Sequence, residues 1–175
     1  KLITGALGSL GLLTRLTLKV RPIPEASAIV WMPLASIDQV DSALETINRS
    51  DSQPVAVELM NRGAARHIGE DLGLPLADWG IAAGIEDMAD SVRWQIERLK
   101  AELPKVEMTV LERPDSEPLW SALTDYPASF PSHLGCVATL RPSSLANLLA
   151  RVDPAAWSIK AHAGNGIVRL DGLAD

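Results

Sequence analysis

The sequence predicts an α+β fold in which helices pack on one face of a largely antiparallel sheet. Three observations lead to this prediction. Short segments with strand patterns recur along the chain, amphipathic helical segments separate most of them, and the last two strands are joined directly by the tight turn Gly164-Asn165-Gly166. The first four strands with their helices match the order of a ferredoxin-like unit, and the later elements extend the same sheet.

The composition is that of a globular protein without a nucleic-acid partner. Of the 175 residues, 47% are apolar and 22% charged, and the net charge is −6. A nucleic-acid-binding protein would present a basic face instead. The single cysteine, Cys136, excludes an internal disulfide framework, and its apolar neighbours predict a buried, inert thiol. No segment approaches the ~20 apolar residues of a transmembrane helix.

A domain boundary is predicted near the start of the chain. Residues 14–21 alternate polar and apolar side chains, as in a half-buried strand. Pro22 and Pro24 then end this pattern and open a linker. We therefore expect residues 1–24 to close one domain and residues 25–175 to form another. Because the chain starts with a lysine inside a pattern, we also expect it to be a piece of a longer protein.

The remaining elements follow from periodicity and from capping residues. Ser36 followed by Gln39 forms a capping box, and Val40, Leu44 and Ile47 give the helix that follows one apolar face. Met88 is expected to join Val92, Ile96 and Leu99 on the apolar face of the longest helix. The predicted strands span residues 28–32, 55–60, 79–85, 105–111, 133–140, 156–162 and 167–170. The predicted helices span residues 36–49, 62–68, 87–103, 116–125 and 142–152.

Two glycine-containing segments are candidates for a ligand site. Gly5, Gly8 and Gly11 are three residues apart and precede a strand, so they match neither the dinucleotide motif nor the P-loop. They form either a structural turn or a backbone surface that a flat ligand can approach closely. At the second segment, His162 and Arg169 flank the turn at residues 163–166. They are either solvent-facing polar ends of a hairpin or the wall of a pocket for an anionic ligand.

The first of these segments resembles a known family. Residues 5–22, with the sequence GALGSLGLLTRLTLKVRP, resemble the closing segment of the FAD-binding domain in FAD-linked oxidases of the vanillyl-alcohol-oxidase type, with Ala6 in place of the usual serine. In that family this turn lies against the flavin. The resemblance implies FAD as cofactor, with contacts from Gly5, Gly8, Ser9, Gly11, Leu12 and Asn165.

The second segment narrows the resemblance. Residues 161–169, with the sequence AHAGNGIVR, resemble the corresponding corner of the glycolate oxidase FAD-binding subunits. Related dehydrogenases carry H-x-G-D-G-N-x-H there and bind a divalent metal through the two histidines. His162 keeps the first histidine, but Ile167 and Arg169 replace the asparagine and the second histidine. Arginine does not ligate metals, so no metal site is expected. The catalytic residues that the resemblance implies are His162 and Arg169.

The resemblance also implies a reaction and a setting. Residues 25–175 would be a complete cap domain over the flavin of a subunit that oxidises a glycolate-like 2-hydroxy acid to the 2-oxo acid. Its partners would be a sister flavoprotein and an iron-sulfur subunit, in the cytoplasm, with attachment to the inner membrane through those subunits left open. We expect FAD in the full-length subunit and not in this chain alone.

Two alternatives stay open on the same residues. The chain could be a non-catalytic scaffold that docks partner subunits, or an unrelated ferredoxin-like domain that binds a small molecule. Residues 55–61 also resemble a strand of the family's cap domain, and there we expect Glu58 to be a paired or edge carboxylate rather than a base. Trp120 is expected in the core, and His67 and His133 are expected to be structural.

Overall fold

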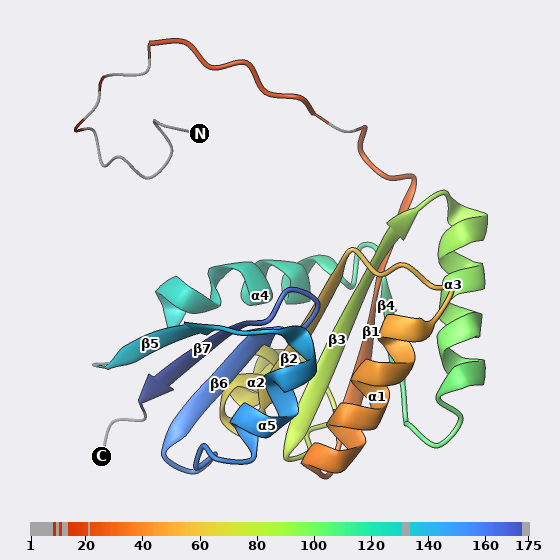
Figure 1. Ribbon diagram of the computed structural model, residues 1–175. Coiled ribbons are helices and arrows are strands. Elements are labelled where there is room, and N and C mark those ends of the chain that lie inside the picture. The colour runs from red at the N-terminus through yellow and green to blue at the C-terminus, as the bar shows by residue number, and fades with distance from the viewer. Residues whose placement is uncertain (1–8, 10, 12–13, 21, 131–133, 173–175) are drawn as a thin grey trace.

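Seven strands form one antiparallel sheet. A computed structural model describes residues 9, 11, 14–20, 22–130 and 134–172 (Figure 1). Within them the strand order is β4-β1-β3-β2-β6-β7-β5, and each pair of neighbours is antiparallel. The strands are β1 (Ala26–Leu34), β2 (Ala56–Asn61), β3 (Trp79–Asp87), β4 (Thr109–Glu112), β5 (Gly135–Thr139), β6 (Trp157–His162) and β7 (Ile167–Gly172).

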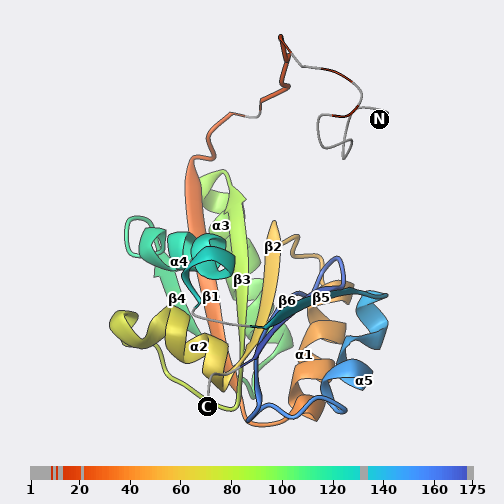
Figure 2. The same cartoon turned by 90° about the vertical axis from the view of Figure 1, so that its left-hand side faces the viewer.

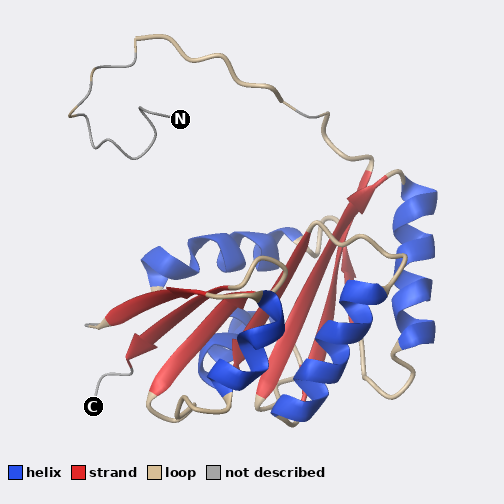
Figure 3. Ribbon diagram, in the orientation of Figure 1, coloured by secondary structure: helices blue, strands red, loops and turns tan. Residues whose placement is uncertain are grey.

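Helices cover both faces of this sheet, so the prediction of helices on one face is wrong. Figure 2 shows α1 and α5 on one side of the sheet and α2 and α4 on the other, and Figure 3 shows the same two layers by colour. The helices are α1 (Ile37–Arg49), α2 (Arg62–Gly69), α3 (Ala89–Glu102), α4 (Glu117–Ser129) and α5 (Leu145–Leu149), with short 3₁₀ turns at Glu70–Leu72 and Pro142–Ser144.

The two-sided cover follows from the side chains of the interior strand β1, which lies between β4 and β3. Val30 and Met32 pack with the helices α1, α3 and α5, whereas Ile29 and Trp31 pack with α2 and α4. All four are buried, although successive residues of a strand point to opposite faces. A strand that is apolar on both sides needs cover on both sides. The continuous apolar run of β1 indicates this arrangement more directly than the order of the elements does.

The capping box at α1 is confirmed, with one difference. The Ser36 hydroxyl accepts a hydrogen bond from the Gln39 backbone N–H at 3.3 Å. The Gln39 side chain reaches back to the N–H of Ala35 at 2.8 Å rather than to that of Ser36. The predicted apolar face of this helix, Val40, Leu44 and Ile47, is buried.

The apolar face predicted for the longest helix, α3, is confirmed except at its first residue. Val92, Ile96 and Leu99 are buried as expected, but the Met88 side chain is 66% exposed. Met88 is the residue before the first turn, and its extended backbone directs it off the helix face.

Asp87, one residue earlier, accepts hydrogen bonds from the Ser91 hydroxyl and from the Met88 N–H, and these two bonds lower the pKa of Asp87.

Asn61, at the end of β2, connects the two halves of the sheet. Its side chain accepts from the N–H of Ile159 at 2.9 Å and donates to the carbonyl of Trp157 at 2.7 Å, both in β6. It also accepts from the N–H of Ala64 in the first turn of α2. One buried amide therefore fixes β6 against β2 although nearly a hundred residues separate them in the sequence.

The predicted strand at residues 14–21 is not formed over its described part. Residues 14–20 have no regular secondary structure and extend away from the sheet (Figure 1). Leu16, Leu18 and Val20 are 67%, 71% and 82% exposed. Alternation predicts a strand only where a neighbouring strand supplies hydrogen bonds, and the described residues of this chain supply none here. Whether residues 1–24 belong to another domain stays a prediction.

The prediction that Cys136 is buried is wrong, because Cys136 lies on an edge strand of the sheet. Cys136 is exposed, as are Leu134 and Val137, because β5 is the outermost strand. The apolar run at residues 134–138 indicates a central strand by composition, but its burial depends on neighbours that the sequence pattern does not specify.

Candidate functional site

A polar cluster lies on the α4 side of strands β2, β6 and β7. Lys160 and His162 lie two residues apart on β6 and so point to the same face. Lys160 is directly opposite Arg169 on β7, and His162 is directly opposite Glu58 on β2. Strand register thus brings side chains from three segments onto neighbouring positions of one surface.

Glu58 is the centre of this cluster. It is 6% exposed, and its two carboxylate oxygens accept hydrogen bonds from two different residues. One oxygen accepts from the Lys160 ammonium at 2.7 Å, and the other is in hydrogen-bond contact with Nδ1 of His162. Lys160 is itself 5% exposed. The expectation that Glu58 is a paired carboxylate is confirmed, and its partners are the two polar residues that enter the turn.

Arg169 is held by a second buried acid, Asp171. Its Nε donates to Asp171 Oδ2 at 2.8 Å, and Asp171 is fully buried. The Arg169 side chain is 30% exposed, and its two terminal amino groups are not used in this contact. Asp171 Oδ1 is buried without a hydrogen-bond partner among the described residues. The acid therefore neutralises Arg169 from the inner side and leaves the outer end of the guanidinium accessible.

His162 and Arg169 line the same small hollow, which we call the Arg169 hollow. Its volume is about 150 Å³, and its other lining residues are Lys160, Ile167, Val137 and Pro127 of α4. His162 and Arg169 thus lie on one surface, as the pocket alternative for these residues requires, and binding of an anionic ligand there stays a prediction. Besides its apolar walls, the hollow is lined by the His162 imidazole and by the Arg169 guanidinium, whose terminal amino groups are not used by Asp171 and can bind a small carboxylate.

Asn165 lies on the other side of His162. It lines a second hollow of about 330 Å³ together with Glu58, His162 and Gly164. The turn itself is closed by hydrogen bonds from the N–H groups of Asn165 and Gly166 to the carbonyl of His162. His162 thus separates two hollows, and its side chain is half-exposed.

The glycine segment at the start of the chain is not brought to this surface by the described residues. Gly5, Gly8 and Leu12 lie outside the part of the chain that the structure describes. Ser9 and Gly11 are described and exposed, and neither lines the Arg169 hollow or the hollow at Asn165. Their contact with a flavin stays a prediction.

Tyr126 of α4 contacts strand β6 close to the polar cluster. The Tyr126 hydroxyl is 2.8 Å from the Ser158 hydroxyl on β6. Burial raises the pKa of Tyr126 to about 12, although the hydrogen bond to Ser158 acts in the opposite direction. His67 packs edge-on against Tyr126 and is within 3.1 Å of the Ser129 hydroxyl. These contacts agree with the structural role expected for His67; His133 lies outside the described residues.

The core position expected for Trp120 is confirmed in part. The indole is partly buried and lies directly over Gly84, where an added Cβ would come within 2.2 Å of the ring. Its Nε1 donates to the Ser27 hydroxyl at 3.3 Å.

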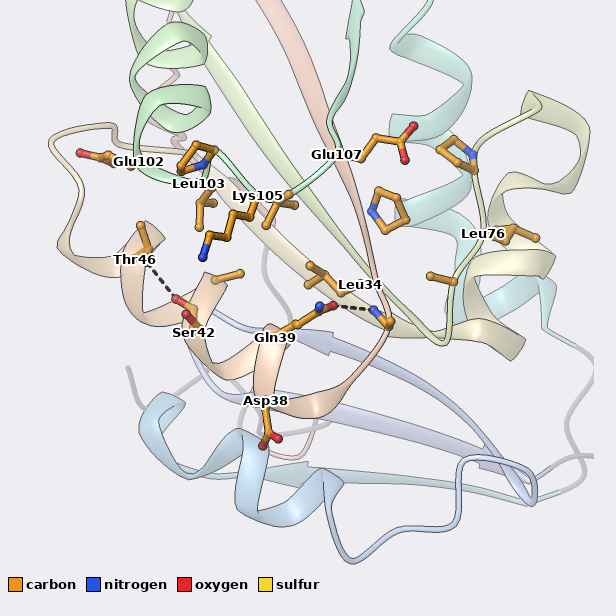
Figure 4. A pocket seen from close by; sticks show the side chains of 17 residues that line it. Leu34, Asp38, Gln39, Ser42, Thr46, Leu76, Glu102, Leu103, Lys105 and Glu107 are labelled. Carbon is orange, nitrogen blue, oxygen red and sulfur yellow. Dashed lines mark hydrogen bonds between the residues drawn. The ribbon is translucent and has the colours of Figure 1, made fainter.

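A larger hollow on the α1 side of the sheet has no convergent polar groups. Its volume is about 760 Å³, and it lies between α1 and residues 102–107. Figure 4 shows the carboxylates of Asp38, Glu102 and Glu107 pointing in three different directions, and among the described residues that line the hollow Lys105 is the one cation. No residue predicted for the site lines it, and the arrangement does not define a reaction.

Two residues of the cluster, Lys160 and Asp171, were missed by the sequence analysis. Each lies two residues from a predicted site residue on the same strand, so each points to the same face as its neighbour. That i, i+2 relation to His162 and Arg169 was the signal that could have found them. In the described part of the chain, no three His, Cys, Asp or Glu side chains are placed to hold a metal ion.

No protein-family model matches the sequence, and no curated protein matches it. Among the described residues, none of the helices combines the length and the apolar character needed to cross a bilayer.

Proposed function

We propose that this chain is the C-terminal part of a FAD-dependent subunit that oxidises a small 2-hydroxy acid to the 2-oxo acid, and that residues 25–175 are its cap domain. The observation that carries the proposal is the shared hollow of His162 and Arg169. The sequence resemblance selects these two residues as catalytic, and the strand register places them on one small surface. The order β4-β1-β3-β2, which is that of a ferredoxin-like unit, also supports the proposal.

The size of the Arg169 hollow fits the substrate and not the cofactor. The hollow has a volume of about 150 Å³, whereas pockets for drug-sized ligands have volumes of about 300–1,000 Å³. Glycolate, with five non-hydrogen atoms, is much smaller than such a ligand. An isoalloxazine ring system is several times larger and would lie over the mouth of the hollow. The flavin would supply the two-electron chemistry, and this chain would supply binding, orientation and a proton acceptor.

We expect Arg169→Ala in the full-length subunit to lower kcat/KM for glycolate-dependent dye reduction about tenfold or more. A charged contact to a carboxylate contributes about 1.5–3 kcal/mol, and this variant removes it. The measurement is dye reduction by the purified subunit without its partners. Arg141→Ala, at an exposed position after β5, is the control for loss of a surface arginine. Unchanged kinetics and flavin content in Arg169→Ala would contradict the role of Arg169.

We also expect that the 175-residue chain purified alone does not retain FAD. The resemblance gives this chain only the closing turn of the flavin site, and the pyrophosphate-binding part lies upstream in that family. The measurement is the absorbance near 450 nm of the purified chain. Flavin that co-elutes with the chain in equal amounts would contradict this expectation.

A second candidate function is a non-catalytic scaffold that docks partner subunits. The open edge of β5 favours it, because Leu134, Cys136 and Val137 are exposed there and the strand carries no charge. Uncharged apolar edge strands are ordinarily covered by another chain or element. The dye-reduction experiment separates the two functions: a full-length wild-type subunit that binds FAD but does not reduce the dye with glycolate would favour the scaffold.

A further inference from the structure

Each of the two side chains proposed for catalysis is held from its inner side by a buried carboxylate. Glu58 contacts the Nδ1 of His162, and Asp171 contacts the Nε of Arg169 at 2.8 Å. In each pair the carboxylate contacts one nitrogen of the side chain, Nδ1 of His162 or Nε of Arg169. The other nitrogens of that side chain make no hydrogen bond with the acid. The two acids come from different strands, β2 and β7, so the repeated arrangement is not a consequence of one local turn.

The contact with Glu58 fixes the tautomer of His162. An ionised carboxylate only accepts hydrogen bonds, and the other oxygen of Glu58 already accepts one from the Lys160 ammonium at 2.7 Å. Nδ1 of His162 must therefore be the donor and carry the proton. In the neutral imidazole, Nε2 is then the nitrogen with a free lone pair. The ring nitrogen left for a ligand is a proton acceptor, not a donor.

The contact with Asp171 orients Arg169 in a similar way. Because Nε is bound to a fully buried acid, the planar guanidinium is fixed in direction, and its two terminal amino groups remain for a second carboxylate. Arg169 and His162 both line one hollow of about 150 Å³. A ligand that uses both must have a carboxylate and, a short distance away, a group that can give up a proton.

We infer that Glu58 and Asp171 are positioning residues for a small 2-hydroxy carboxylate in the Arg169 hollow, an inference that rests on the proposed function. Arg169 binds the carboxylate through its terminal amino groups, and Nε2 of His162 accepts the proton of the 2-hydroxyl group. When the acid is oxidised, Nε2 of His162 would accept the O–H proton, and FAD held by the full-length subunit would supply the acceptor for the hydride that leaves C2. The C–O bond becomes a carbonyl.

The test of Glu58 uses a pair of double variants that differ in one property. Glu58→Gln with Lys160→Met removes the buried charges but keeps an oxygen that can accept from Nδ1. Glu58→Leu with Lys160→Met removes the charges and the acceptor. The measurement is the ¹⁵N chemical shifts of His162 in the ¹⁵N-labelled chain, at a pH where the imidazole is neutral. His67, which contacts Ser129 instead, is the internal reference.

We expect Nδ1 to carry the proton in the wild type and in the Gln variant, and this preference to be lost in the Leu variant. A Glu58 that only neutralised Lys160, without accepting from Nδ1, would not move the tautomer. If His162 keeps its Nδ1 proton in the Leu variant, or never has one in the wild type, the inference is overturned. Both double variants remove the two charges together, so neither leaves an unpaired buried ion.

The test of Asp171 is ligand binding to the chain, with glycolate as the probe and ethylene glycol, which lacks the carboxylate, as the control. Backbone amide shifts of β6 and β7 report the binding. We expect glycolate but not ethylene glycol to shift them. Asp171→Asn, which keeps an acceptor for Nε, should change the affinity less than about threefold, and Asp171→Leu should lower it about tenfold or more. Equal affinity in Asp171→Leu, or equal shifts with ethylene glycol, would overturn the inference.

The outcomes separate the inference from the proposed function. A wild-type subunit without glycolate-dependent dye reduction overturns the function, whatever the tautomer of His162. Dye reduction by a subunit in which Glu58→Leu with Lys160→Met has no effect on the His162 tautomer overturns the inference and leaves the function standing.

Discussion

Replacing Glu58 by alanine is expected to lower the free energy of unfolding by about 3–5 kcal/mol, because it leaves the Lys160 ammonium buried without a counter-charge. Lys160 is 5% exposed, and Glu58 Oε2 at 2.7 Å is its ion-pair partner. Lys160→Ala should have an effect of similar size, since it leaves the carboxylate unpaired. The measurement is urea unfolding followed by circular dichroism.

The matched control for this prediction is Glu58→Leu with Lys160→Met. Removing both charges also removes the cost of taking them out of water, so we expect the double variant to be within about 1 kcal/mol of the wild type or more stable. A double variant as unstable as the single ones would show that the pair stabilises the fold by itself. In that case stabilisation of the fold would account for the pair, without a role in arranging the site.

Replacing Gly166 by alanine is expected to lower the free energy of unfolding by about 2–4 kcal/mol, from left-handed backbone strain and overpacking. Gly166 has a φ of 70°, and an added Cβ would lie 2.0 Å from the carbonyl oxygen of Leu140. That oxygen belongs to the backbone and cannot rotate away as a flexible side chain would. The measurement is again urea unfolding.

Gly164→Ala in the same turn is the control. An added Cβ there meets nothing within 4 Å, and the residue has no positive φ. We expect its free energy of unfolding to change by less than about 0.5 kcal/mol. Equal effects at the two positions would mean that the turn relaxes around a side chain, and would contradict the steric reason given for Gly166.

The sequence predicts those features of the fold that are set by interactions between residues close together in the chain. The start of α1 at Ser36 and the buried stripe of Val40, Leu44 and Ile47 follow from local hydrogen bonds and from helical periodicity. Strand positions and the tight turn follow likewise. The second covered face of the sheet, the exposure of Cys136 and the lack of a strand at residues 14–20 do not, since each depends on which strands lie side by side.

The candidate site also has features that follow from the local sequence and features that depend on the pairing of distant strands. The sequence by itself determined that His162 and Arg169 flank a two-strand turn, because two strands joined by so short a turn pair with each other. Only the tertiary structure decided that Glu58, about a hundred residues earlier, meets His162 and Lys160, and that Asp171 holds Arg169. Long-range strand pairing creates those contacts: β2 lies beside β6 because Asn61 and the sheet register fix it there, and no local pattern in the sequence specifies which strand will be its neighbour.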